Sequence, residues 1–243
     1  MPITGYSGGI MQFINNPPWG GPTDHLIHRW QLDDASVSGS TVIDLAGSLN
    51  GTITGGVTSV SSPAGAYAST ARHFDGTGYI NLGAAALPDF TGAHSVFFWL
   101  NLTNNANVGG TASQSPLDLH FDSNNKVRIA NDEAISGGGT GGYVVSFVQA
   151  GTNIGREVNI SNTIPSNSWV HLGYTWDGAN ISLYVGGVVQ APPPQTAFGV
   201  NTLDVIGSAL VGVNSAIVGS MYQVCVWSKV LSGTEITQVF SAK

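Results

Sequence analysis

The sequence predicts an all-β sandwich, and three observations lead to this fold class. Only 9% of the 243 residues are charged, against about a quarter in average soluble domains. Hydrophobic residues make up 42% of the chain, and 33 Gly and 11 Pro divide it into short apolar segments. Long solvated helices and coiled coils depend on Glu, Lys and Arg, so this composition excludes them.

The charge and cysteine counts exclude further classes of protein. Seven Lys and Arg are scattered singly among 14 Asp and Glu, too few to neutralise a phosphate backbone, so we expect no nucleic-acid partner. No apolar run approaches the roughly 20 residues that span a bilayer, so we expect no membrane partner. Cys225 is the one cysteine, which excludes an internal disulfide, and we interpret it as an inert core thiol. The first residues lack the basic and apolar regions of a secretory signal peptide.

Two regions follow from the pattern: an extended Gly/Pro-rich arm at residues 1–24 and one sandwich domain at residues 25–243. The arm is more apolar than a free tail, which is usually polar. Either it folds back on its own domain, or it docks on a neighbouring subunit. In the docking hypothesis its partner-binding residues are Ile10, Met11, Phe13, Ile14 and Trp19.

The strands of the sandwich are predicted from alternation. Residues 170–176 and 181–185 each carry one apolar face and flank the turn Asp177-Gly178, which indicates a hairpin. Residues 96–100 and 222–227 are apolar on both faces, as central strands between two layers are. Ser232 and Glu235 form a capping box, which predicts a short helix at the end of the chain.

Several motifs resemble those of a laminin-G-like domain of the concanavalin A-like lectin and glucanase superfamily, over about residues 25–240. The segments that carry the likeness, in family order, are residues 28–34 (HRWQLDD), 44–52 (DLAGSLNGT), 74–80 (FDGTGYI), 95–99 (SVFFW), 168–172 (SWVHL), 184–187 (YVGG), 206–208 (IGS) and 231–236 (LSGTEI). The resemblance implies two antiparallel sheets in a jelly roll. It implies little about chemistry, because this fold hosts lectins, adhesion modules, enzymes and virion proteins. Gly186 and Gln223 stand where family members often carry acidic residues, which weakens the case for a metal-assisted ligand site.

Enzymatic activity is not expected. A retaining glucanase needs two carboxylates on one strand face, one as nucleophile and one as acid. Glu133, Glu157 and Glu235 have no acidic partner two or four positions away. No G-x-S-x-G motif indicates a serine nucleophile either.

No cofactor is expected, although one metal alternative stays open. Asp122 to Glu133 has the length of a calcium loop, but Lys126 and Val127 stand where a ligand oxygen and a Gly are needed, so we predict a hairpin there. The six His residues show no zinc-ligand spacing. The open alternative is a calcium ion at the rim, as in laminin-G domains, bound through Asp75 or Asp177.

For function we carry three hypotheses. The first is a non-enzymatic structural virion protein, a capsid decoration or tail surface component of a bacteriophage, with copies of itself and other virion proteins as partners and the virion surface as its location. The lack of a signal peptide and disulfide, the few charges and the apolar arm favour it. The second is an extracellular carbohydrate-binding or adhesion module, for which Trp19, Tyr79, Tyr143 and Trp176 are candidate stacking residues. The third is a polysaccharide-active enzyme.

Overall fold

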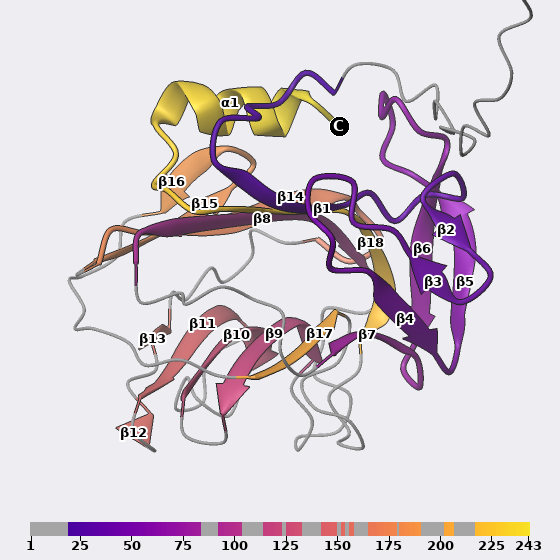
Figure 1. Ribbon diagram of the computed structural model, residues 1–243, viewed down its shortest axis with the longest axis horizontal. Coiled ribbons are helices and arrows are strands. Elements are labelled where there is room, and N and C mark those ends of the chain that lie inside the picture. The colour runs from indigo at the N-terminus through magenta and orange to yellow at the C-terminus, as the bar shows by residue number, and fades with distance from the viewer. Residues whose placement is uncertain are drawn as a thin grey trace, which may run out of the picture.

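Two antiparallel sheets form the layers of a sandwich, and one helix covers the outer face of the first sheet (Figure 1). The computed structural model describes the backbone alone of strands β9–β13 and β17, and describes in full residues 19–83, 92–103, 165–178, 180–190 and 217–243. The predicted all-β sandwich is confirmed. No helix in this described part is long and apolar enough to cross a membrane.

The first sheet has eight strands in the order β16-β15-β14-β8-β18-β6-β5, with β1 also paired to β18. The predicted hairpin is confirmed as β14 and β15, where Trp176 pairs with Ile181 across the turn. The strands of this sheet are β1 (Leu26–Trp30), β5 (Val57–Ser61), β6 (Thr70–Asp75), β8 (His94–Leu102), β14 (Val170–Trp176), β15 (Ile181–Val185), β16 (Val188–Gln190) and β18 (Val218–Trp227).

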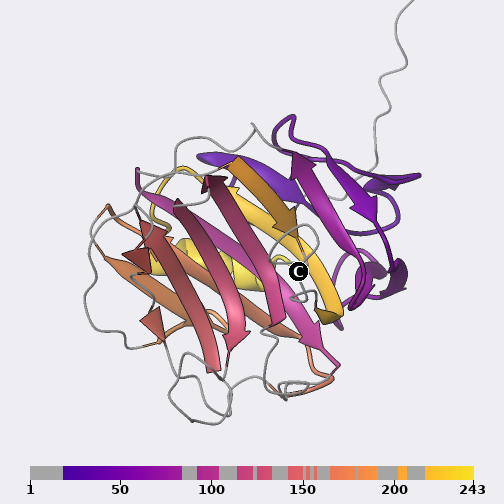
Figure 2. The same cartoon turned by 90° about the horizontal axis from the view of Figure 1, so that it is seen from below.

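The second sheet has ten strands in the order β12-β11-β10-β9-β17-β7-β4-β3-β2, with β13 paired to β11 (Figure 2). Asp122 pairs with Asn125 between β9 and β10, so the hairpin predicted in place of a calcium loop is confirmed. Its strands are β2 (Val37–Ser38), β3 (Thr41–Val42), β4 (Gly51–Thr54), β7 (Tyr79–Gly83), β9 (Gln114–Asp122), β10 (Asn125–Asp132), β11 (Gly142–Gln149), β12 (Thr152–Asn153), β13 (Arg156–Glu157) and β17 (Thr202–Ile206).

Strand β8 is apolar on both faces because it lies between two hydrophobic layers, as predicted. Its side chains Val96, Phe98 and Leu100 face the core between the sheets, together with residues of β7 and β14. Phe97 and Trp99 face outward into clusters completed by the helix. Both faces are buried, so a polar residue on either side of β8 would lose favourable burial.

The helix α1 (Gly233–Ser241) lies on the outer face of the first sheet (Figure 1). The predicted capping box is confirmed: the Ser232 side chain accepts from the Glu235 amide, and the Glu235 carboxylate accepts from the Ser232 amide. Ile236 and Val239 are buried against the sheet with Phe97 and Cys225.

Strand β18 contains a bulge that the sequence pattern did not predict. Gln223 has a φ of 53°, and its amide donates to the Gln31 carbonyl at 3.0 Å. The pairing of β18 with β8 shifts register between Tyr222 and Cys225. As a result Tyr222 packs in an outer cluster with Trp99, whereas Val224 lies in the core between the sheets. The bulge therefore interrupts the regular alternation of side chains along this strand.

Candidate functional site

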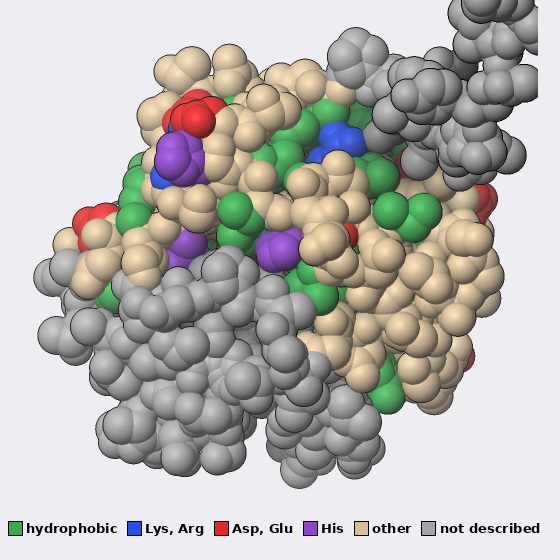
Figure 3. Space-filling view, viewed as in Figure 1, with side chains coloured by type: hydrophobic (Ala, Val, Ile, Leu, Met, Phe, Trp, Pro, Cys, Tyr) green, Lys and Arg blue, Asp and Glu red, His purple; other side chains and the backbone are tan. Residues whose placement is uncertain are grey.

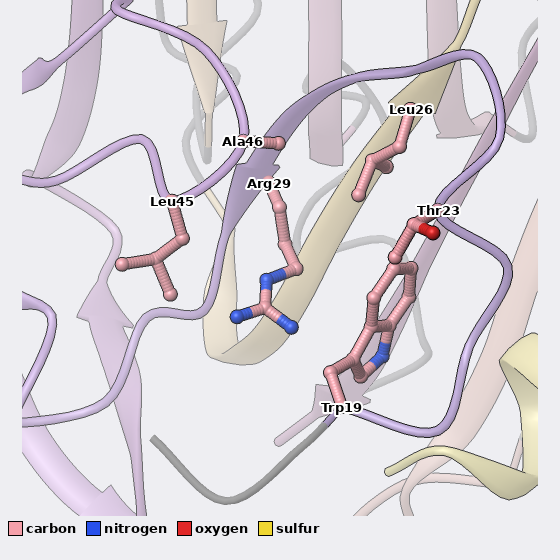
Figure 4. Close-up of a pocket in the computed structure, with 6 residues that line it drawn as sticks. All are labelled: Trp19, Thr23, Leu26, Arg29, Leu45 and Ala46. Carbon is pink, nitrogen blue, oxygen red and sulfur yellow. The ribbon is translucent and has the colours of Figure 1, made fainter. Parts of the chain in front are cut away.

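A pocket of about 450 Å³ lies beside β1, where the described chain begins (Figure 4). Three pieces of chain form it: residues 19–24, which we call the N-terminal segment, strand β1, and the turn after Asp44. Figure 4 shows the Arg29 guanidinium between the side chains of Leu45 and Trp19. The lining residues are Trp19, Thr23, Leu26, Arg29, Leu45 and Ala46.

Among the described residues that line this pocket, Arg29 is the one that carries a charge. Alternation along β1 places Trp30 in the core, so Arg29 faces the other side of the strand. Its guanidinium carbon lies 4.9 Å from the centroid of the Trp19 ring, a cation–π contact, and the residue is only 7% exposed. Within the described part of the chain, no oxygen accepts a hydrogen bond from this guanidinium. The indole ring offsets only part of the cost of burying the charge.

Trp19 is held in place by its own domain. Its ring centroid lies 6.1 Å from that of Trp227, and the Trp227 indole N–H donates to the Pro22 carbonyl at 2.9 Å. A Cβ atom on Gly21 would lie 2.3 Å from the Trp19 ring, so glycine permits this close packing. The N-terminal segment is thus anchored on the first sheet.

The other predicted arm residues, Ile10, Met11, Phe13 and Ile14, lie outside the described residues. The structure therefore gives the position of Trp19 alone among them. Docking of the arm on a neighbouring subunit stays a prediction, as does folding back over its full length.

The opposite wall of the pocket depends on Asp44. The Oδ1 atom accepts from the amides of Arg29, Ala46 and Gly47 at 2.9–3.1 Å. The Oδ2 atom accepts from the Leu49 amide at 3.0 Å and contacts Nδ1 of His28 at 2.7 Å. This carboxylate fixes the turn that presents Leu45 and Ala46 to the pocket.

Charged side chains are few among the described residues on the face shown in Figure 3. Near the N-terminal segment, Lys229 bridges the carboxylates of Asp24 and Glu235, each at 2.7 Å. The hydrogen bonds from Lys229 and from the Ser232 amide lower the pKa of Glu235 to about 2. Lys229 is therefore neutralised by two acids, in contrast to Arg29, and Asp24 is engaged with Lys229.

The described acidic residues do not form a catalytic pair. Glu235 closes the helix cap and the Lys229 bridge. Glu133 and the side chain of Glu157 lie outside the described residues. Within the described part, we find no arrangement of the kind a retaining glycosidase needs.

The two candidate calcium ligands lie at opposite ends of the first sheet. Asp75 ends β6 and pairs with Val218, whereas Asp177 follows Trp176, which pairs with His94 at the other end of β8. Asp75 accepts from the amide and hydroxyl of Thr77. In the described part of the chain, no three His, Cys, Asp or Glu residues are placed to hold one metal ion. The two acids therefore cannot share one ion, and a calcium ion at either of them stays a prediction.

Two histidines of the first sheet, His94 and His171, are buried. Burial lowers the pKa of His94 to about 4 and that of His171 to about 3. His94 lies beside the Tyr174 hydroxyl, while His171 stacks on Phe97. Burial also raises the pKa of the Cys225 thiol to about 12. These groups are neutral at pH 7 and fit a structural role.

The candidate stacking residues with described side chains do not form one platform. Trp176 is 1% exposed and belongs to the core, as its alternation predicted. Tyr79 is half-buried in β7, and the side chain of Tyr143 lies outside the described residues. Trp19 reaches the pocket, but Arg29 covers its ring. Arg29 was not among the predicted site residues, because a lone basic residue in a strand is also typical of an ordinary surface position.

Solved structures with the same architecture include three carbohydrate-related or toxin proteins. Domain 4 of an extracellular arabinanase from Geobacillus stearothermophilus, in complex with arabinotriose, has a TM-score of 0.66 and 16% identity, over 88% of this chain and 97% of that one. The binding domain of Paraclostridial Mosquitocidal Protein 1 has a TM-score of 0.65 and 16% identity. Trypanosoma rangeli sialidase in complex with sialic acid has a TM-score of 0.63 and 14% identity. These two alignments cover 90% and 91% of this chain but only 52% and 33% of theirs. At such identities the likeness establishes the fold alone.

Sequence comparison places the chain in a family. No curated protein matches it as a relative. A family model described as the concanavalin A-like lectin/glucanases superfamily matches residues 74–237, which is more than half of the chain. The match covers β7, the central strands β8 and β18, and the capping box. The chain belongs to the concanavalin A-like lectin/glucanases superfamily.

Proposed function

We propose that this chain is a non-catalytic module that binds glycans. The observation that carries the proposal is the likeness in fold to the arabinanase domain solved with arabinotriose, which extends over 97% of that domain. That structure is a separate domain, so its match does not depend on an attached catalytic unit. A second support is that the described acids of this chain are engaged in caps, turns and ion bridges.

A glycan array tests the proposal. The full chain, labelled at a single site, is applied to neutral and acidic glycans, and each positive is repeated by calorimetry in solution. We expect saturable binding to one related group of glycans. Absence of binding to every glycan, together with no retention on polysaccharide gels, would contradict the proposal.

The same material separates binding from catalysis. We propose that the chain works without a cofactor and leaves its glycan intact. The array positives are incubated with the protein, with and without added calcium, and the products are separated by chromatography. Cleavage that disappears when a named carboxylate is replaced would favour the enzyme hypothesis instead.

The structural virion protein is the second candidate, with the virion surface as its location. The anchored N-terminal segment favours it, because an arm that starts from a fixed point on the first sheet can reach a neighbouring copy. Light scattering of the full chain tests it. A closed oligomer that dissociates when residues 1–18 are removed supports this candidate, whereas a 25.1 kDa monomer at high concentration contradicts assembly through copies of this chain.

A further inference from the structure

We propose that the pocket beside β1 binds the carboxylate of an acidic sugar, through the Arg29 guanidinium. This inference rests on the proposed glycan-binding function and specifies its ligand as a uronic acid.

The first argument compares the two buried arginines of the first sheet. Arg72 is 6% exposed, and its guanidinium donates to Oδ1 of Asp34 at 2.7 Å and to the Asp33 carbonyl at 3.1 Å. Arg29 is 7% exposed, yet within the described residues its guanidinium has only the Trp19 ring. A buried guanidinium stays charged and has five donors. Arg29 therefore has unused capacity to bind an anion.

The second argument concerns the acids that could have neutralised Arg29. Asp44 pairs with Trp30 of the same strand, but its two oxygens already contact five donors, two in β1 and three in the turn. Asp24 is adjacent to the pocket residue Thr23, but its carboxylate binds Lys229 at 2.7 Å. Both acids are thus held by other partners, and within the described residues neither of them neutralises Arg29.

The third argument concerns the shape and lining of the pocket. A carboxylate matches the planar fork of a guanidinium with two parallel hydrogen bonds. Leu26 and Leu45 offer apolar surface for the C–H groups of a sugar ring, and the exposed Thr23 hydroxyl can bond a sugar hydroxyl. The volume of about 450 Å³ is large enough for one sugar ring.

The test uses the full chain and three probes in a ¹⁵N NMR titration that follows the Trp19 indole N–H. The probes are D-glucuronate, D-glucose, which lacks the carboxylate, and acetate, which lacks the ring. We expect a saturable shift with glucuronate, and at least tenfold weaker binding of glucose and of acetate. Glucose binding as tight as glucuronate would overturn the role of Arg29, and equal binding of acetate would overturn the assignment to a sugar.

Variants then locate the site. Arg29→Gln is expected to weaken glucuronate binding at least tenfold, and Thr23→Val two- to tenfold. Thr23 is exposed, so Thr23→Val keeps the test valid if Arg29→Gln does not fold. Arg72→Gln is the matched control: it breaks a paired buried arginine and lowers the melting temperature without changing the affinity for glucuronate. Unchanged affinity in both pocket variants would overturn the proposal.

The array distinguishes this inference from the function on which it rests. Acidic glycans that bind the wild type but not Arg29→Gln support both. If glycans bind the wild type and Arg29→Gln equally well, the assignment of the pocket as the binding site is wrong, while the glycan-binding function stands. An array with no positive overturns the function itself.

Discussion

Nδ1 of His28 lies 2.7 Å from Oδ2 of Asp44, sixteen positions later in the chain. The Asp44 side chain is fully buried, and four backbone amides also donate to it. Burial raises the pKa of the Asp44 carboxyl, but the hydrogen bonds from His28 and the backbone outweigh burial and lower it to about 2. This one carboxylate joins β1 to the turn that forms a wall of the Arg29 pocket.

Asp44→Asn is expected to destabilise the domain by about 2–3 kcal/mol. The substitution replaces one carboxylate oxygen by an NH₂ group, which cannot accept the hydrogen bonds from Leu49 and His28. Urea denaturation measures the free energy of unfolding. Asp75→Asn is the control: Asp75 is exposed and bonds only within its own turn, so we expect an unchanged midpoint. Equal effects of the two variants would contradict the role assigned to Asp44.

Asp44 also predicts how stability depends on acid. In the unfolded chain its carboxyl takes up a proton near its ordinary pKa of 3.8, but in the folded protein only near pH 2. The unfolded state therefore binds more protons in this range, and the free energy of unfolding falls as the pH drops from about 4 to about 2. In Asp44→Asn this part of the fall is expected to disappear. Identical slopes for the two proteins would refute the assignment.

The close approach of the turn to β1 requires a glycine at position 47. A Cβ atom there would lie 2.5 Å from the Ile27 carbonyl oxygen and 2.6 Å from Oδ2 of Asp44. We expect Gly47→Ala to destabilise the domain by about 2–3 kcal/mol, since the turn must shift. Gly233→Ala is the control, because a Cβ atom at Gly233 meets nothing within 4 Å. The difference between their urea midpoints tests this prediction.

Local patterns in the sequence predicted the local structure of the fold. The hairpin of β14 and β15 and the capping box at Ser232 and Glu235 depend on residues close together in the chain, so alternation and spacing were enough. The jelly roll came from a resemblance in motif order, not from periodicity. The strand order in each sheet depends on contacts between distant segments, which periodicity does not encode.

The bulge and the pocket could not be predicted either, because they also depend on contacts between distant segments. Gln223 adopts a positive φ because β18 changes its neighbour from β6 to β1 at this point. Nothing in the local sequence shows this change of partner. Likewise Trp19, Arg29 and Leu45 share a pocket only because the Asp44 turn and the N-terminal segment pack on either side of β1.

His171 predicts a second pH effect at milder acidity. Its imidazole is buried against Phe97, Trp99 and Phe240, which keeps it neutral, and burial lowers its pKa to about 3. Because an unfolded histidine takes up a proton near pH 6.5, the free energy of unfolding falls as the pH drops from about 6.5 toward 3. His171→Phe keeps an aromatic ring and is expected to make this fall smaller, the remainder arising from His94. The test is to measure the urea midpoints of the wild type and of His171→Phe as a function of pH. Identical profiles of the two proteins would contradict the prediction.

Two truncations separate the structural from the docking role of the N-terminal region. Under the docking hypothesis, a chain that starts at residue 19 keeps the Trp19 and Pro22 contacts with Trp227 and is expected to unfold at the wild-type urea midpoint. Removing residues 1–24 also removes the Trp19 packing and leaves the buried Trp227 indole N–H without the Pro22 carbonyl. We expect a loss of about 2–4 kcal/mol.

Light scattering and urea denaturation of the chain without residues 1–18 distinguish the two hypotheses for the arm. If the arm docks on a neighbour, removing residues 1–18 abolishes assembly and leaves the stability of the sandwich intact. If it folds back on its own domain, the same deletion lowers the urea midpoint, and the oligomeric state stays that of the full-length chain. The deletion changes only the mass under the first hypothesis and only the urea midpoint under the second, so it decides between them.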